Sequence, residues 1–164
     1  MVSSDRVARA QQQWMRERPD LDSTPMLVIA RLHRLAAHLT AELLPVYAQF
    51  GLGEGEFDVL ATLRRTGEPY ELAPGELARF TMVTTGAISK RLDRLEAAGL
   101  VSRRPSEADG RGRYVALTTA GRELIDEAYT AHLRNEARLV GALSPADRAT
   151  LEGLLSQWLG EFEN

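Results

Sequence analysis

KRLDRLEAAGLVSRRPSEADGRGRYVALT, residues 90–118, is the stretch of this chain that decides the fold. It begins inside an amphipathic helix, because the apolar residues Ile88, Leu92 and Leu95 recur at spacings of four and three and so form one stripe. Gly99 then ends that helix. Short apolar runs on either side of residues 105–112 predict two strands joined by a basic, glycine-rich hairpin. This order of elements is typical of a module that places a helix in the major groove of DNA.

A second, shorter helix precedes the amphipathic one. Pro74 suits the first turn of a helix at residues 74–78, and residues 80–84 then form the connecting turn. Two helices joined by a short turn predict a helix-turn-helix whose second helix, residues 85–98, contacts DNA. The polar face of this helix and the tip of the hairpin supply the candidate DNA-binding residues, which are Thr85, Gly86, Ser89, Lys90, Arg94, Asp109 and Arg111. Asp109 is expected to orient the guanidinium of Arg111 toward phosphates or the minor groove.

The charge distribution agrees with DNA binding, although the net charge of the chain is −3. Residues 79–113 carry eight Lys or Arg against four Asp or Glu, a net charge of +4, which leaves −7 on the rest of the chain. Such asymmetry concentrates a favourable field where DNA would lie. We therefore expect double-stranded DNA to be a partner and its binding to depend strongly on salt.

Composition excludes several other classes of protein. The chain has no cysteine, which excludes a disulfide scaffold and a cysteine-ligated zinc site. His33, His38 and His132 are scattered and no nucleophile motif occurs, so we expect no enzymatic activity, no metal and no cofactor. No apolar run is long enough to span a membrane, and the first residues lack the apolar core of a signal peptide. These features predict a cytoplasmic protein.

The rest of the chain predicts helices around the helix-turn-helix, so the expected fold class is mainly α with a small β-wing. We expect an added N-terminal helix in residues 1–22, a long scaffold helix in 23–53, the winged helix-turn-helix in 54–118 and C-terminal dimerisation helices in 119–164. The last helix has an apolar face made of Leu151, Leu154, Leu155, Trp158, Leu159 and Phe162. A terminal helix this apolar predicts burial in a homodimer, with packing onto its own chain as the alternative.

About 45 residues of this chain resemble the MarR family of winged-helix transcription regulators. The matching residues are Leu77, Ala78, the run from Ser89 to Glu96, Gly99, Leu100, Val101, Arg103, Asp109, Arg111, Val115, Leu117, Thr118 and Gly121. The resemblance implies a dimeric regulator whose two recognition helices lie about one DNA turn apart, ~34 Å, on a pseudo-palindromic operator. It also implies a small ligand that controls DNA binding.

An added N-terminal helix that carries a tryptophan resembles the urate-responsive branch of this family. Members of that branch hold their ligand with a tryptophan of the added helix and an aspartate of the helix before the helix-turn-helix. Two arginines, one in the recognition helix and one in the first wing strand, complete the site. By resemblance these roles fall on Trp14, Asp58, Arg91 and Arg103. The implied function is a repressor that urate releases from its operator.

The chemistry of these four residues suits an anion. Arg91 lies at the edge of the apolar stripe and Arg103 shares a strand face with Val101, so both arginines are expected to point inward. With Asp58 they leave a net positive pocket, and Trp14 adds a flat wall for a planar ring. Alternatives remain open: another anion such as an aromatic carboxylate or a tricarboxylate, a structural ion pair between Asp58 and either arginine, or a protein-interaction adaptor with no small-molecule ligand.

Overall fold

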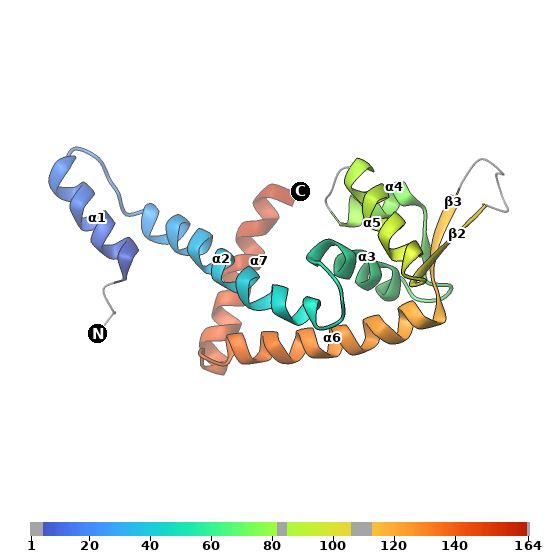
Figure 1. The fold of residues 1–164 in the computed structure, drawn as a ribbon. Coiled ribbons are helices and arrows are strands. Elements are labelled where there is room, and N and C mark those ends of the chain that lie inside the picture. Colours follow the sequence, from blue (N-terminus) through green and yellow to red (C-terminus); the bar gives the residue numbers. More distant parts are fainter. Residues whose placement is uncertain (1–4, 82–84, 106–112, 164) are drawn as a thin grey trace. The chain divides into compact units, whose positions relative to one another are not determined.

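The computed structural model describes residues 5–81, 85–105 and 113–163, and within these ranges the side chains of residues 85–87 are not described. Seven helices and three short strands lie in the described residues (Figure 1). Two compact units divide the chain, residues 1–43 and residues 44–164. The winged helix-turn-helix expected in residues 54–118 lies entirely in the second unit.

The first unit contains the added N-terminal helix that the sequence predicts. Helix α1 spans Arg6–Glu17, and the side chain of Asp5 caps it by accepting a hydrogen bond of 2.8 Å from the backbone N–H of Ala8. The carboxylate of Asp5 also accepts a 2.8 Å hydrogen bond from Arg31 on α2. Helix α2 spans Met26–Ala48 and keeps Pro45 inside its last turn. Asp5 therefore both begins α1 and fastens it to α2.

The second unit contains the predicted helix-turn-helix and wing. Helix α3 spans Glu54–Arg65, α4 spans Pro74–Phe80 and α5 spans Thr85–Ala97, with α4 opened by its proline as expected. Strands β2 (Val101–Pro105) and β3 (Arg113–Leu117) form the hairpin. A two-residue strand that the sequence did not predict, β1 (Glu71–Leu72), pairs with the other edge of β3, so the antiparallel sheet has the order β1-β3-β2.

The core of the second unit lies between α3, α5 and the sheet. The stripe of Ile88, Leu92 and Leu95 is buried, which confirms the predicted amphipathic helix. Gly99 takes a φ of +72° after α5, a left-handed conformation that favours glycine and ends the helix. The other fully buried large residues are Val59, Leu60, Leu63, Leu77, Val115 and Ile125.

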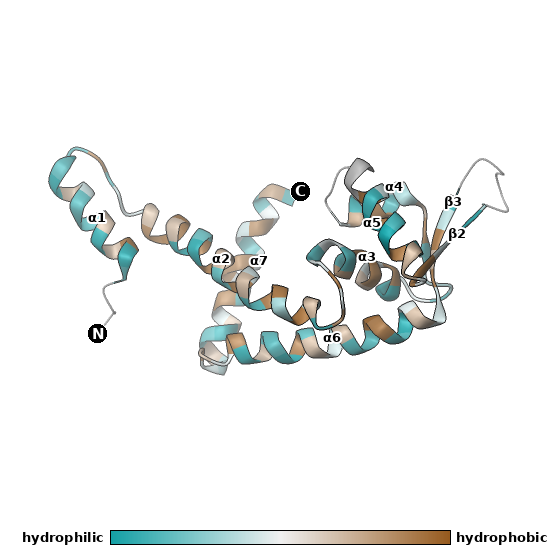
Figure 2. Cartoon of the chain, viewed as in Figure 1, coloured by the Kyte–Doolittle hydropathy of each residue, from teal (hydrophilic) through white to brown (hydrophobic). Residues whose placement is uncertain are grey.

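Two helices follow the wing. Helix α6 spans Thr119–Val140 and is capped by the Thr118 hydroxyl, which accepts a 3.0 Å hydrogen bond from the backbone N–H of Gly121. Polar and apolar residues alternate along α6 in Figure 2. Helix α7 spans Pro145–Glu163 and has no buried residue. The apolar face of α7 is thus not buried within the second unit, and its burial in a homodimer or on its own chain stays a prediction.

Candidate functional site

The recognition helix α5 presents a polar face to solvent. Ser89 and Lys90 are exposed, and the side chain of Arg94 is 75% exposed. Thr85 and Gly86 lie in the first turn of α5, where side chains are not described, and Asp109 and Arg111 lie outside the described residues. An open polar face is what groove binding requires, while the individual DNA contacts stay predictions.

Arg94 has a protein partner as well as an open face. Its Nη1 donates a 3.1 Å hydrogen bond to Oε1 of Glu56 on α3, a carboxylate that is only 14% exposed. The other oxygen of Glu56 accepts from the backbone N–H of Gly53, just before α3 begins. A phosphate that binds Arg94 therefore has to compete with Glu56 or use the remaining donors of the guanidinium.

Asp58 and Arg91, two of the four predicted ligand-binding residues, influence each other across the α3–α5 contact. Although Asp58 is exposed overall, partial burial of its carboxyl and the nearby charge of Glu54 raise its pKa, while the charge of Arg91 acts to lower it. The Nη1 of Arg91 is buried and has no hydrogen-bond partner among the described atoms. This burial confirms the predicted inward direction of Arg91. The unpaired Nη1 also means that Asp58 does not satisfy it as a structural ion pair would.

Arg103 takes a different orientation from the one predicted. Its Nη1 donates to Glu96 at 2.7 Å and its Nη2 donates to Asp93 at 2.7 Å, and both carboxylates belong to α5. The Asp93 hydrogen bond is the largest cause that raises the pKa of Arg103. The guanidinium of Arg103 is thus paired with α5 and does not join Asp58 as the expected positive pocket requires, because two acidic side chains one turn apart on α5 lie within reach of it. A role of Arg103 in ligand binding stays a prediction.

Trp14 lies on α1, in the first unit. Its side chain is exposed within that unit. It lines a shallow pocket of about 280 Å³, together with Arg18, Leu21, Asp22, Ser23 and Met26. The role of Trp14 as a flat wall for a ligand of the second unit stays a prediction.

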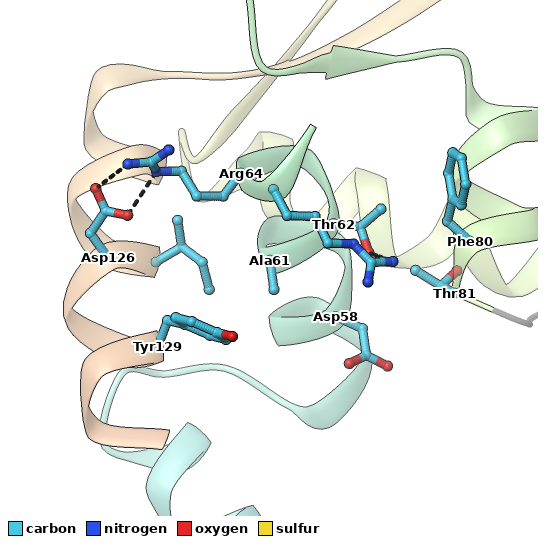
Figure 3. Close-up of a pocket in the computed structure, with 10 residues that line it drawn as sticks. Asp58, Ala61, Thr62, Arg64, Phe80, Thr81, Asp126 and Tyr129 are labelled. Atoms are coloured by element: carbon cyan, nitrogen blue, oxygen red, sulfur yellow. Dashed lines mark hydrogen bonds and ion pairs between the residues drawn. The ribbon is translucent and has the colours of Figure 1, made fainter. Parts of the chain in front are cut away.

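A larger pocket of about 570 Å³ lies in the second unit, beside Asp58 (Figure 3). It is lined by Asp58, Ala61, Thr62, Arg64, Arg65, Phe80, Thr81, Ile125, Asp126 and Tyr129. Arg64 is turned toward Asp126, to which it donates hydrogen bonds of 2.7 and 3.2 Å, and Phe80 lies on the opposite side of the view. Arg65 has a weaker contact, 3.5 Å from its Nη2 to the Thr62 hydroxyl. Sequence reasoning identified only Asp58 of this lining.

An aromatic cluster fixes α3 against α6 next to this pocket. The ring of Phe57 on α3 lies 5.0 Å from that of His132 and 6.5 Å from that of Tyr129, both on α6, and it stacks on Tyr47 at 4.3 Å. Burial, together with the charges of Asp58 and two glutamates, raises the pKa of Tyr47 to about 12. The cluster reaches the pocket through Tyr129, which is part of its lining.

In the part of the chain that the structure describes, no group of three His, Asp or Glu side chains is placed to hold a metal ion. Among the same residues, no helix is both long and apolar enough to cross a membrane.

A helix-turn-helix followed by a β-hairpin, with a basic, solvent-facing second helix, defines a winged-helix DNA-binding protein. Residues 50–112 match the model of the MarR family. The chain is 40% identical over 146 residues to the HTH-type transcriptional regulator PecS of Dickeya dadantii (strain 3937), a match that covers 89% of this chain and 88% of PecS. This chain belongs to the MarR family and is a DNA-binding transcription regulator, not an enzyme.

Solved structures agree with this assignment. A MarR variant from E. coli in complex with operator DNA is 28% identical, with a TM-score of 0.71 over 85% of this chain and 99% of that chain. Another neighbour is BpsR of Bordetella bronchiseptica, whose structure is described as a mechanism for regulation of DNA binding by 6-hydroxynicotinic acid. BpsR is 25% identical, with a TM-score of 0.70 over 80% of this chain and 91% of that chain.

Proposed function

We propose that this protein is a homodimeric repressor that a small planar anion, with urate as the first candidate, releases from a pseudo-palindromic operator. The observation that carries the proposal is the buried, unpaired Nη1 of Arg91, whose charge acts on Asp58; Asp58 in turn lines the pocket of about 570 Å³. A buried donor without a partner typically costs about 1–3 kcal/mol, so an anion that accepts its hydrogen bond recovers this free energy. As a DNA-binding regulator, the protein is proposed to act in the cytoplasm.

Asp58 couples ligand binding to the uptake of a proton. Because burial raises the pKa of its carboxyl, Asp58 takes up a proton more readily than an ordinary aspartate. An anion next to it raises that pKa further, since two like charges disfavour each other. The protonated carboxyl can then donate a hydrogen bond to the ligand. The proposal therefore expects ligand binding to be coupled to proton uptake and to tighten as the pH falls.

Release of DNA follows from the position of Arg91 on the recognition helix. A ligand that binds Arg91 changes how α5 is held against α3, and Arg103 connects α5 to the wing strand β2 through Asp93 and Glu96. A shift of α5 is thus transmitted to the wing. If the ligand prefers the shifted form, its coupling to DNA binding is typically about 1–3 kcal/mol, or about 5- to 150-fold in affinity.

The exposed apolar face of α7 supports the homodimer. Its members are Leu151, Leu154, Leu155, Trp158, Leu159 and Phe162, all exposed in the single chain. Apolar patches of this kind mark interfaces in soluble proteins. A second copy that covers this face would present two recognition helices about 34 Å apart, as a pseudo-palindrome requires.

The test is an operator-binding titration with the DNA upstream of the protein's own gene. Urate is varied from micromolar to millimolar, and 6-hydroxynicotinate and citrate are titrated in parallel. We expect urate to weaken binding by about 5- to 150-fold. Unchanged operator binding over the whole range would overturn the urate assignment, and release by 6-hydroxynicotinate alone would favour an aromatic carboxylate.

Two variants of α5 separate the ligand-binding role from the DNA-binding role. Arg91→Ala is expected to reduce the effector response more than it weakens operator binding. Arg94→Ala is the matched control, because Arg94 is exposed on the same helix, and it is expected to weaken operator binding while the fold-change with urate persists. The reverse pattern would place Arg91 on DNA. Absence of any DNA binding at low salt would favour the adaptor alternative.

A further inference from the structure

Gly55, the second residue of α3, leaves room for the side chain of Arg91. A Cβ atom at this position would overlap the guanidinium carbon and Nε of Arg91 and would lie 2.6 Å from its Nη2. Glycine is a poor helix former, and Gly55 has no positive φ that would require it. The close approach of the guanidinium is thus the feature that accounts for a glycine here.

We propose that Gly55 is a positioning residue for the effector response: the notch that it leaves on α3 seats the guanidinium of Arg91 and so holds the recognition helix against the helix that carries Asp58. The inference rests on the proposed function only in taking Arg91 and Asp58 as the effector site. Gly55 and Asp58 are three residues apart and share one side of α3. The notch therefore determines how close Arg91 lies to Asp58.

The notch places the guanidinium of Arg91, a cation, at the amino-terminal end of α3, where a helix disfavours positive charge. The amino-terminal end of a helix carries a partial positive charge, and the first turn of α3 offsets it with Glu54 and Glu56. Glu56 is already bonded to Arg94, so Arg91 lies in the notch with its Nη1 unpaired. An anion that binds beside the notch relieves both the unpaired donor and the repulsion by the helix end. This makes the Gly55–Arg91 contact the part of the α3–α5 interface that responds most to an anion.

The chain provides a matched control for a substitution at Gly55. Gly153 also lies inside a helix, and a Cβ atom there would meet nothing within 4 Å. By helical geometry Gly153 lies opposite the apolar face of α7, so an alanine there leaves that face unchanged. Gly153→Ala thus adds a methyl group to a helix without touching Arg91.

The first experiment needs no effector. The carboxyl carbon of Asp58 is titrated by NMR in the full-length wild type, Gly55→Ala, Arg91→Ala and Gly153→Ala proteins. Because the charge of Arg91 lowers the pKa of Asp58, we expect Gly55→Ala and Arg91→Ala both to raise it, and Gly153→Ala to leave it at the wild-type value. If Arg91→Ala raises the Asp58 pKa and Gly55→Ala leaves it unchanged, the notch does not position Arg91 and the inference is overturned.

The second experiment measures operator affinity and its response to urate. We expect Gly55→Ala to raise the urate concentration for half-release about tenfold or more, with a change of about threefold or less in operator affinity without urate. In the Arg91→Ala background, Gly55→Ala should add no further effect, as for two changes that act through one contact. An added effect in that background would overturn the inference.

The outcomes separate this inference from the urate proposal. If urate fails to release the wild-type protein while Gly55→Ala still shifts the titration of Asp58, the positioning role stands and only the ligand assignment fails. If Gly55→Ala does not fold, Gly55→Ala/Arg91→Ala should fold, because removal of the guanidinium makes room for the methyl group. Misfolding of that double variant as well would show that Gly55 is needed for another reason.

Discussion

Replacement of Arg103 by alanine removes two side-chain hydrogen bonds that join strand β2 to the recognition helix and keeps the 3.2 Å bond from its backbone N–H to Glu96. Arg103 is 22% exposed, and its partners Asp93 and Glu96 are 66% and 40% exposed, so both ion pairs are strongly screened by solvent. Exposed pairs are typically worth about 0.2–1 kcal/mol each. Two such pairs give a loss of about 0.4–2 kcal/mol in the free energy of unfolding, or a fall of about 1–8 °C in the thermal midpoint for a chain of this size.

The assay is thermal unfolding followed by circular dichroism at one fixed protein concentration, since a dimer's midpoint depends on concentration. Arg103→Ala, Asp93→Ala and the double variant form a cycle that isolates the coupling between the two side chains. The coupling should shrink in 1 M NaCl, where the Debye length is about 3 Å. Arg134→Ala, which removes an exposed arginine of α6, is the control and should leave the midpoint unchanged.

The same variants decide between the two roles of Arg103. Because the ion pairs connect the wing to α5, Arg103→Ala should weaken operator binding. Most of the fold-change with urate should persist, since the ligand still shifts α5 itself. The reasoning is refuted if the midpoint stays within about 1 °C of the wild type and the cycle shows no coupling. If the urate response is lost in that case, Arg103 binds the ligand, as the sequence predicted.

Three further predictions concern packing and pH. Gly121→Ala should lower the free energy of unfolding by about 1–3 kcal/mol in urea titrations, because its Cβ would overlap the carbonyl oxygen of Leu100. The hydrogen bonds of Arg31 and a backbone N–H lower the pKa of Asp5 to about 2, so the attachment of α1 to α2 should persist above about pH 4 and be lost as the pH falls through about 2. The fluorescence of Trp14 on α1, measured in a variant that lacks Trp158 on α7, reports this loss. Asp5→Asn should abolish the transition. Burial raises the pKa of Asp58, so its ionised carboxylate destabilises the fold as the pH rises through the pKa of the folded state. Asp58→Asn should therefore raise the thermal midpoint at pH 7. The same variant should weaken the urate response at least tenfold.

Local patterns predicted most of the fold. The helical spacing of the apolar residues placed the stripe of α5 correctly, and a glycine at the end of that stripe marked where the helix stops. Strand β1 was missed because two residues are too few to show a period of their own. It forms only because β3 offers an unpaired edge.

The candidate site shows the same division between local and tertiary information. The inward direction of Arg91 follows from its angle on one helix, and its Nη1 is buried as predicted. The direction of Arg103 depends on which hydrogen-bond acceptors lie nearby. The alternation of side chains along a strand does not predict whether Arg103 pairs with Asp93 and Glu96 or with Asp58. Pocket residues such as Phe80 and Tyr129 come from separate helices, so no spacing in the sequence joins them.

Three arginines fix the position of the recognition helix, and each makes a different kind of contact. Arg91 lies against Gly55 with an unpaired donor, Arg94 is bonded to a carboxylate of α3, and Arg103 connects α5 to the wing. The Arg94 and Arg103 contacts are satisfied ion pairs, so an added anion gains little from them. The Arg91 contact leaves a buried donor unpaired, so there an anion gains the most. Because all three contacts meet on α5, a change at Arg91 alters the helix that faces DNA without first breaking the wing.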